Sequence, residues 1–567
     1  MNARLAIQAI ATLLAAACAH AAAPRSVETA EPRGTERLIV RLAEGARLAP
    51  LLHGPLGREV AVEQIVTRAP LRAILRARSG AAADARRLAA EWSRAAGVDY
   101  ATAERFWPME LRGRHEPDDP LFPQQWPLDN RGQGGDRRPD PAGGDVDAPE
   151  AWIHTLGSPE VLIAVLDDGI ELTHPDLAPN VAAAGMDFTT NPPAPGAEPR
   201  DDADRHGTAV AGVLAARGDN GIGVTGICPR CRILPIRVQG SSNLGTAAAF
   251  RYAVEQGADV ITNSWGYTRP VASRDGAADD AVRDAIEAAA REGRQGRGTL
   301  IVFGMTNDNV DNCRAPTADI SSLASVLAVG VANHDDEVGG AGFGACIDLV
   351  APAKPKDRST IGVVTTDRLG QAGHTADDYY TGFGGTSAAA PLVAGIAGLL
   401  LSLNPDLTRN ELKLILEHTA DKIDPAGARY DAAGFSERAG HGRVNAARAL
   451  VPAAKIAVTP ARVAAGEPFS VTVTASAPYG LESVWWSIRG PGGDGAAHRR
   501  ELAGEPVESV TWSRVVLDTP GTYTLVADAR DVRHAEDLSP YPHRAGERAP
   551  EPTVQLTVVE RSDAVSR

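Results

Sequence analysis

Val161-Leu-Ile-Ala-Val-Leu-Asp-Asp-Gly169 is the stretch that decides the fold of this chain. Its first six residues are apolar without alternation, which is typical of a strand buried on both faces of a parallel sheet. The two aspartates therefore emerge at the carboxyl end of a strand, where open α/β sheets place functional groups. Strand and helix patterns alternate up to about Leu450. We expect an α/β domain whose parallel sheet is flanked by helices.

The second informative segment is Arg205-His-Gly-Thr208. It opens a run of small apolar residues, 207–216, which indicates a buried helix with His206 at its start. A hydroxyl is a poor nucleophile at neutral pH unless a base removes its proton and a third group orients that base. A strand-end aspartate and a histidine could serve as that third group and that base.

The third segment, Gly384-Gly-Thr-Ser-Ala-Ala-Ala-Pro391, supplies the hydroxyl. It opens a helix whose apolar part is the run 392–403 and whose first turn is expected to contain Pro391, where a missing N–H breaks no helical hydrogen bond. Ser387 then lies at a helix N-terminus, and its own N–H can face a developing oxyanion. Any one segment is weak evidence, whereas all three in the order Asp, His, Ser form a specific pattern.

This order resembles that of the subtilisin-like serine peptidases, and the sequences of the three motifs are most similar to those of the kexin/furin branch. The resemblance implies that Asp167 orients the imidazole, that His206 is general base and then acid, and that Ser387 is the nucleophile. Asp167 is preferred to Asp168 because the family's catalytic carboxylate comes first after the strand. The expected activity is that of a secreted serine endopeptidase, which cleaves peptide bonds through an acyl-enzyme.

Thr299-Leu-Ile-Val-Phe-Gly-Met-Thr-Asn307 is another buried strand, and it ends in an amide side chain. The family has a glycine–asparagine pair where this chain has Thr306 and Asn307. The resemblance implies that Asn307 donates a hydrogen bond to the oxyanion, with Asn309 as the competing candidate.

In this family the substrate adds as a strand beside the enzyme's own, here Val260–Gly266. The primary specificity pocket is then expected to be lined by Ser264, Trp265 and Gly266. Kexin-like enzymes follow this motif with an acidic cluster that selects basic residues, but this chain continues with Tyr267-Thr-Arg-Pro270. Asp168 matches the second aspartate of the kexin motif, which contacts a basic residue next to the cleavage point. One of the two acidic features that select basic residues in kexin-like enzymes is therefore present in this chain, and the other is missing.

The resemblance also implies a structural Ca²⁺ ion, which binds six to eight oxygens. Side-chain oxygens are expected from Asp119, Asp176 and Asn220, and main-chain oxygens from Arg217, Ile222 and Val224. Asp311 matches a ligand of a second site whose other ligands are missing. Nothing suggests catalytic zinc.

Four of the five cysteines remain when Cys18 is set aside, an even number that fits an oxidising compartment. Cys228-Pro-Arg-Cys231 could be a redox or zinc motif, but no second pair or histidine cluster accompanies it, so a short disulfide is favoured. Cys313 and Cys346 are then a hypothetical second pair.

Residues 1–23 are interpreted as a signal peptide, with Arg4 before an apolar stretch and small residues at its end. The stretch is too short to span a membrane, and we expect no transmembrane segment elsewhere. Cys18 offers a lipid-anchor alternative. We expect a secreted, periplasmic or cell-surface protein.

Residues 24–114 resemble in layout the family's propeptide, a small α+β domain that assists folding and then inhibits the enzyme. Strands are expected at 37–42 and 98–101 and a helix at 82–92. The peptidase domain is expected at 115–452, and Leu111-Arg-Gly-Arg114 is an attractive site for self-cleavage.

After residue 452 the pattern changes to short alternating strands separated by Pro, Gly and Asp, expected at 455–458, 469–475, 483–488, 509–517, 522–527 and 553–559. This spacing favours an all-β immunoglobulin-like (Ig-like) sandwich over 453–562. Trp485, Trp486 and Trp512 indicate either a carbohydrate-binding face or, preferably, core packing.

The 567 residues include 57 Lys and Arg against 72 Asp and Glu, a formal net charge of −15. Nucleic acid is therefore not an expected partner, because phosphate binding needs a basic footprint. The expected partners are protein or peptide substrates and the chain's own propeptide. Two alternatives remain: a processing peptidase selective for basic residues, and a catalytically silent binding or adhesion scaffold.

Overall fold

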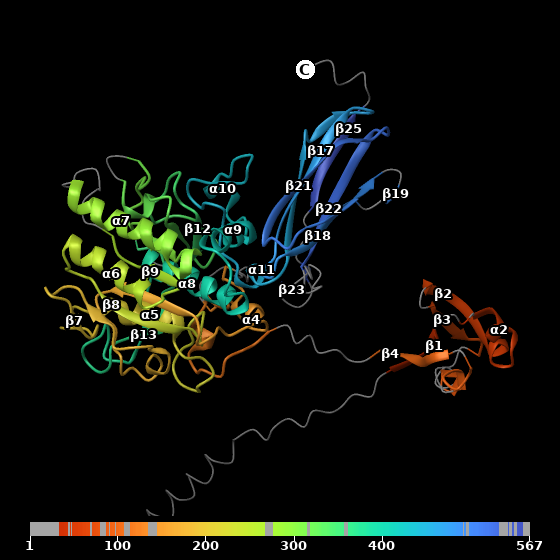
Figure 1. Cartoon of the computed structure of the whole chain (residues 1–567), viewed down its shortest axis with the longest axis horizontal. Coiled ribbons are helices and arrows are strands. Elements are labelled where there is room, and N and C mark those ends of the chain that lie inside the picture. Colours follow the sequence, from red (N-terminus) through yellow and green to blue (C-terminus); the bar gives the residue numbers. More distant parts are fainter. Residues whose placement is uncertain are drawn as a thin grey trace, which may run out of the picture. The chain divides into compact units, whose positions relative to one another are not determined.

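The computed structural model of this chain divides into two compact units, Met1–Arg112 and Gly113–Arg567 (Figure 1). The residues it describes are 33–43, 46, 48–68, 71–79, 87–89, 91–96, 98–106, 114–133, 144–266, 276–314, 318–356, 361–490, 493–494, 498–531, 542–543, 547–548 and 553–559. The expected signal peptide, with Cys18, lies outside the described residues. So do Leu111, Arg112 and Gly113 of the expected self-cleavage segment.

The first unit contains a four-stranded antiparallel sheet in the order β2-β3-β1-β4. Its elements are β1 (Arg33–Leu42), α2 (Leu48–His53), η2 (Leu56–Glu59), β2 (Val60–Arg68), β3 (Leu71–Ala77) and β4 (Val98–Phe106). The strands expected at 37–42 and 98–101 fall within β1 and β4, whereas β2, β3 and α2 were not predicted. Leu88 and Trp92, from the expected helix, are buried with Leu42 and Leu75 in the core of this unit.

The second unit is built around an eight-stranded sheet in the order β12-β11-β10-β9-β5-β8-β6-β7. Its strands are β5 (Leu162–Asp167), β6 (Met186–Asp187), β7 (Ala194–Pro195), β8 (Arg232–Arg237), β9 (Val260–Asn263), β10 (Leu300–Gly304), β11 (Leu327–Ala332) and β12 (Leu349–Pro352). All neighbouring strands are parallel except β6 and β7. The parallel α/β prediction is therefore confirmed.

Helices cover both faces of this sheet. Their bounds are α5 (His206–Ala215), α6 (Asn243–Glu255), α7 (Gly276–Glu292), α8 (Thr386–Leu403) and α9 (Arg409–Thr419). Ile163 and Val165 of β5 pack in the core that includes α5, α8 and α9, whereas Leu162, Ala164 and Leu166 pack in the core that includes α6 and α7. Because β5 is buried on both sides, its side chains alternate between two apolar layers.

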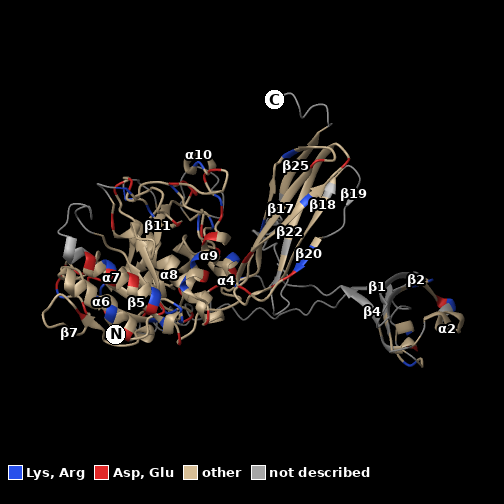
Figure 2. Ribbon diagram, turned by 45° about the horizontal axis from the view of Figure 1, so that its top comes forward, with Lys and Arg blue, Asp and Glu red and all other residues tan. Residues whose placement is uncertain are grey.

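Smaller elements complete this domain, and acidic and basic residues are interspersed along its ribbon (Figure 2). They are η3 (Phe122–Gln124), α4 (Ala148–Ala151), η4 (Ala178–Asn180), η6 (Arg294–Gly296), η7 (Ile320–Ser322), β13 (Val363–Thr366), β14 (Tyr379–Phe383), α10 (Pro425–Ala428) and α11 (Ala446–Ala449). β13 and β14 form an antiparallel pair that leads directly to Gly384 and α8.

Helix α8 begins at Thr386, so Ser387 lies in its first turn as expected, whereas Pro391 lies inside the helix and not in its first turn. A proline in a helix leaves the carbonyl four residues before it without a hydrogen bond. That carbonyl belongs to Ser387, and it accepts a hydrogen bond from Ser264 Oγ at 3.0 Å instead. Within the described residues α8 is the one helix long and apolar enough to cross a membrane, and 83% of it is buried in the protein, as in a core helix.

The C-terminal part consists mainly of two sheets, β15-β17-β21 and β16-β25-β22-β18-β19, with β20 beside β18. The strands are β15 (Ala453–Thr459), β16 (Arg462–Ala464), β17 (Pro468–Ser476), β18 (Leu481–Gly490), β19 (Gly493–Asp494), β20 (His498–Glu501), β21 (Val507–Val516), β22 (Gly521–Asp531) and β25 (Thr553–Val559), with the short pair β23 (Pro542–His543) and β24 (Glu547–Arg548). All six expected strands are present. Trp486 is fully buried with Trp512 packed against it, so these two tryptophans serve the core.

Candidate active site

Asp167 and His206 meet at the carboxyl end of β5. Asp167 is the last residue of that strand, His206 is the first residue of α5, and Asp167 Oδ1 lies 2.8 Å from His206 Nδ1. The carbonyl oxygen of Asp167 is held by the N–H groups of Val238 and Gln239, which follow β8. A carboxylate on Nδ1 leaves Nε2 as the nitrogen that can accept a proton.

The charge of Asp167 decides the protonation of the imidazole. Burial alone would lower the pKa of His206, but the Asp167 charge, its hydrogen bond and the Asp168 charge outweigh burial and raise that pKa to about 9. The imidazolium is therefore the stable form of His206 at neutral pH when no substrate is bound.

Asp168 caps α5. Its Oδ2 accepts from the His206 N–H at 2.9 Å and its Oδ1 accepts from the Gly207 N–H at 2.7 Å, which satisfies two amides of the first helical turn. Burial and the neighbouring Asp167 charge raise the pKa of Asp168 to about 7. A Cβ on Gly207 would approach the Gly169 carbonyl oxygen to 2.4 Å, so only glycine fits there. The predicted contact of Asp168 with a basic substrate residue stays a prediction.

Ser387 is the second residue of α8, so its N–H has no intrahelical acceptor. Its Oγ donates to the Ser264 carbonyl oxygen at 3.4 Å, a long contact, and makes no hydrogen bond to His206. The His206 ring packs edge-on against Phe383, with centroids 5.6 Å apart, and Phe383 is the last residue of β14, just before the serine segment. The chain thus brings the imidazole to the strand that leads into α8.

Asn307 lies beside the start of α8. Its Oδ1 accepts from the Thr386 N–H at 2.9 Å, which leaves Nδ2 free to donate, and Nδ2 donates to no described residue. Gly385 has a φ of 69°, and a Cβ there would approach Asn307 Oδ1 to 2.7 Å, so glycine is needed at this crossing. Asn309, the competing candidate, is exposed and does not line the pocket next to Asn307.

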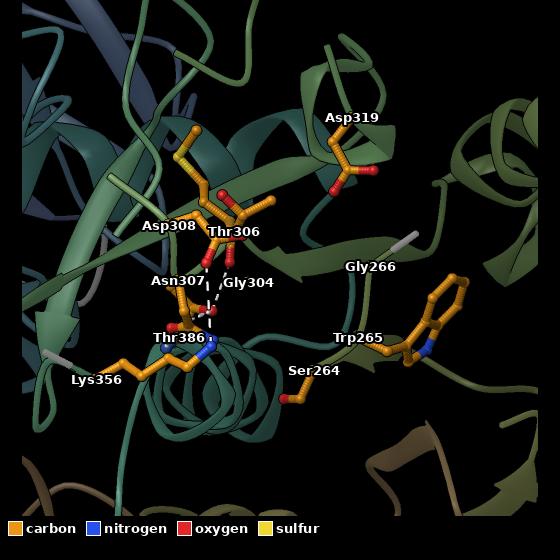
Figure 3. Close-up of a pocket in the computed structure, with 11 residues that line it drawn as sticks. Ser264, Trp265, Gly266, Gly304, Thr306, Asn307, Asp308, Asp319, Lys356 and Thr386 are labelled. Carbon is orange, nitrogen blue, oxygen red and sulfur yellow. Dashed lines mark hydrogen bonds and ion pairs between the residues drawn. The ribbon is translucent and has the colours of Figure 1, made fainter. Parts of the chain in front are cut away.

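A pocket of about 240 Å³ opens beside these groups (Figure 3). It is lined by Ser264, Trp265, Gly266, Gly304, Met305, Thr306, Asn307, Asp308, Asp319, Lys356 and Thr386. The three residues predicted to form the specificity pocket are all among them.

Asp319 is a buried acidic residue of this pocket that was not predicted from the sequence. It is only 5% exposed, and its carboxylate lies next to Gly266, where a Cβ would come within 3.0 Å of Oδ2. Lys356 Nζ, the cation of the pocket lining, lies 4.0 Å from Asp308 Oδ1 at the exposed rim. Asp319 comes twelve residues after Asn307, in a loop without periodicity. The one sequence signal for it is that it is acidic and follows the predicted oxyanion residue.

Asp119, Asp176 and Asn220 lie together. Asn220 Nδ2 donates to Asp176 Oδ1 at 2.8 Å, and Asp119 Oδ1 accepts from the Asn220 N–H at 3.3 Å. Burial, and after it the nearby carboxylates, raises the pKa of Asp119 to about 6, and burial also raises the pKa of Asp176. The carbonyl oxygens of Arg217, Ile222 and Val224 accept no hydrogen bond from the described residues. Adjacent carboxylates with raised pKa values beside free carbonyls fit Ca²⁺.

Both expected cysteine pairs are disulfides in this structure, Cys228–Cys231 and Cys313–Cys346. No cluster of three or more His, Cys, Asp or Glu suited to a metal occurs among the described residues. Asp311 Oδ1 accepts from the Cys313 N–H at 2.9 Å and thus belongs to the loop between Asn307 and Asp319.

Comparisons with known proteins agree with this geometry. The profile of the Subtilase family matches residues 158–442. A calcium-dependent protease of Trichormus variabilis is 34% identical over 354 residues, 58% of this chain and 51% of that protein. Human proprotein convertase subtilisin/kexin type 7 is 32% identical over 351 residues, 60% of this chain and 42% of that protein. The chain therefore spans about half the length of the curated relatives it matches.

The fold is shared with a solved structure. The serine protease of Aeromonas sobria, in complex with its chaperone, superposes with a TM-score of 0.52 at 21% identity, over 78% of this chain and 92% of that chain. The share of this chain that superposes is larger than the part that the family profile matches.

Proposed function

Because this chain belongs to the subtilase family, we propose that it is a serine endopeptidase that cleaves peptide bonds with Ser387 as nucleophile. The observation that carries the proposal is the 2.8 Å hydrogen bond between Asp167 and His206, whose ring packs against Phe383, four residues before Ser387. His206 Nε2 takes the Ser387 proton as Oγ attacks the scissile carbonyl, and then gives it to the leaving amine. A water molecule, deprotonated by His206 in the same way, then attacks the acyl-enzyme, and Ser387 Oγ leaves with that proton.

The oxyanion of the tetrahedral intermediate is held by two donors. One is the free N–H of Ser387 in the first turn of α8, and the other is Nδ2 of Asn307, whose orientation is fixed by the Thr386 N–H. These donors are in place before the reaction, so little reorganisation is needed as negative charge develops.

Labelling with a serine-directed fluorophosphonate tests this proposal. The protein freed of its first unit is expected to form one covalent adduct, located at Ser387 by peptide mass spectrometry, and to hydrolyse casein. A folded protein that neither labels nor cleaves would favour the binding or adhesion scaffold.

The catalytic rate is expected to depend on an alkaline pKa. Below its pKa His206 carries a proton and cannot accept the one from Ser387, so kcat/KM should rise tenfold per pH unit and level off near pH 9. The measurement is kcat/KM between pH 6 and 10.5 with a peptide that has no titrating group in this range. An acid limb centred at pH 6.5 or below would show that Asp167 does not act on His206 in this way.

We further propose that the enzyme selects a basic residue on the amino side of the scissile bond, and Asp319 supports this selectivity. A buried carboxylate at the pocket wall favours a cationic side chain, because the two charges meet away from water. A peptide library with all residues at that position distinguishes a selective processing peptidase from a broad degradative enzyme.

Calcium is proposed as a stabilising ion held by Asp119, Asp176, Asn220 and the three free carbonyls. The name of the similar Trichormus variabilis protein, a calcium-dependent protease, supports this proposal. When bound, the ion supplies charge balance for two buried carboxylates and no step of the reaction.

Chelation is expected to lower the melting temperature by about 5–10 °C at pH 7.5. The effect should shrink at pH 5, because Asp119, with its raised pKa, then becomes largely protonated and no longer repels Asp176. Differential scanning calorimetry with and without EDTA measures both values. The variant Asp119→Asn serves as the control and should be insensitive to EDTA; equal melting temperatures for the wild type would contradict the site.

We also propose that the protein is exported and then matures by self-cleavage. We expect residues 1–23 to be removed on secretion and the first unit to be cut off near residues 111–119. N-terminal sequencing and intact mass of the secreted protein, beside the Ser387→Ala variant, report both events and any lipid on Cys18. An uncut wild type would contradict self-maturation.

A further inference from the structure

Arg237 ends β8, the strand next to β5. In the sheet register it lies opposite Asp167 on one side and opposite Asp187 of β6 on the other. Charged residues are seldom buried unless paired, and Arg237 is only 6% exposed. A buried cation therefore lies on the strand next to the triad aspartate, directly opposite it in the sheet.

The guanidinium of Arg237 contacts three segments of the chain. Nε donates to the Asp168 carbonyl oxygen at 2.9 Å, and Nη2 donates to Asp204 Oδ2 at 2.7 Å. Nη1 donates to Thr189 Oγ1 at 2.9 Å and lies 3.6 Å from Asp187 Oδ2. Only the flat, five-donor guanidinium can bind all of these oxygens at once.

Two of these three segments carry members of the triad. The Asp168 carbonyl immediately follows Asp167, and Asp204 precedes His206 by two residues. The Asp167 carboxylate and the His206 imidazole therefore sit on segments that share one buried cation. We propose that Arg237 is a positioning residue for the triad: it ties the turn after β5 to the segment before α5, and so fixes the imidazole against its carboxylate.

The surrounding charges are consistent with this role. Asp187 and Asp204 face Arg237, and Arg200 faces Asp187 from the exposed side, with Nη2 2.6 Å from Oδ2. Two cations thus face two carboxylates, and both carboxylates of the cluster have a partner within the protein. Asp204 also accepts from the Arg200 N–H at 2.9 Å, which holds its carboxylate toward Arg237.

The variant Arg237→Lys tests this inference, which rests on the proposed function. Lysine keeps the positive charge but has one nitrogen in place of the separate Nε and Nη2 that bind the Asp168 carbonyl and Asp204. We expect kcat to fall by about 10- to 100-fold while KM changes by less than about threefold, because misplacement of catalytic groups slows chemistry and not binding. The rate of fluorophosphonate labelling should fall in parallel, and the acid limb of kcat/KM should move to lower pH as the Asp167–His206 contact loosens.

The control is Arg232→Lys, the same change at the other end of β8, and its kinetic constants should stay within about twofold of the wild type. All rates are expressed per active site, titrated with the fluorophosphonate, so partial unfolding does not count as lost catalysis. Should Arg237→Lys fail to fold, Asp204→Asn removes the other end of the clamp and should show the same fall in kcat.

The outcomes separate the two claims. A wild type that does not label overturns the proposed function and this inference with it. A wild type that labels, beside an Arg237→Lys or Asp204→Asn protein with unchanged kcat and pH profile per active site, overturns the inference alone and leaves Arg237 a purely structural residue.

Discussion

Replacing Ser387 by alanine is expected to lower kcat by about 10⁶-fold, the scale on which serine triads fail when one member is removed. The acyl-enzyme cannot form without Oγ, and the residual rate comes from the oxyanion donors alone. The fold should survive, since Ser264 Oγ donates to the main-chain oxygen of residue 387, which alanine retains. Initial rates on a peptide substrate and the melting temperature measure both effects.

Ser402→Ala is the matched control, because Ser402 lies on the same helix, near its end, and its Oγ donates to the Gly398 carbonyl oxygen at 2.7 Å. This variant should retain wild-type kcat. If Ser387→Ala keeps more than about one hundredth of the wild-type kcat, the reaction does not pass through Ser387.

Replacing Asp319 by asparagine is expected to lower kcat/KM for substrates with arginine at the primary position by about 10²- to 10³-fold. Asp319 is only 5% exposed in the wild type. In the variant, a substrate cation that enters the pocket would therefore lose its water without gaining a carboxylate partner. Substrates with an uncharged residue at that position should lose far less. The ratio of the two kcat/KM values reports the charge contribution independently of the amount of folded enzyme.

Asp308→Asn is the comparator, since Asp308 lines the same pocket but 73% of its side chain is exposed. Water screens charges there, and the expected change is less than about threefold. Equal effects of the two substitutions, or an unchanged arginine preference in Asp319→Asn, would place the specificity elsewhere.

Much of the fold could be predicted because it follows from local patterns. The run from Val161 to Leu166 had to be a strand buried on both faces, and β5 is one. The alternation after residue 452 likewise indicated the six principal strands of the sandwich. By contrast, β2 and β3 of the first unit were missed, because their sequences are interrupted by Arg and Glu and their pairing is set by long-range contacts.

The positions of three candidate residues could be predicted because they stand at element ends: Asp167 at the end of β5, His206 at the start of α5 and Ser387 at the start of α8. The site could not be predicted where tertiary contacts decide. Pro391 was expected in the first turn of α8, where a proline breaks no hydrogen bond, but it lies deeper in the helix, and the Ser264 hydroxyl donates to the carbonyl that Pro391 leaves without its helical partner. Asp319 and Arg237 follow no pattern, since their partners come from segments distant in the sequence.

The most direct measurement is a crystal structure of the fluorophosphonate adduct of the mature enzyme. The account predicts phosphorus bonded to Ser387 Oγ and the phosphonyl oxygen within hydrogen-bond reach of Asn307 Nδ2 and the Ser387 N–H. It also places His206 between Asp167 and the adduct. An adduct on another side chain, or an imidazole turned away from both neighbours, would contradict it.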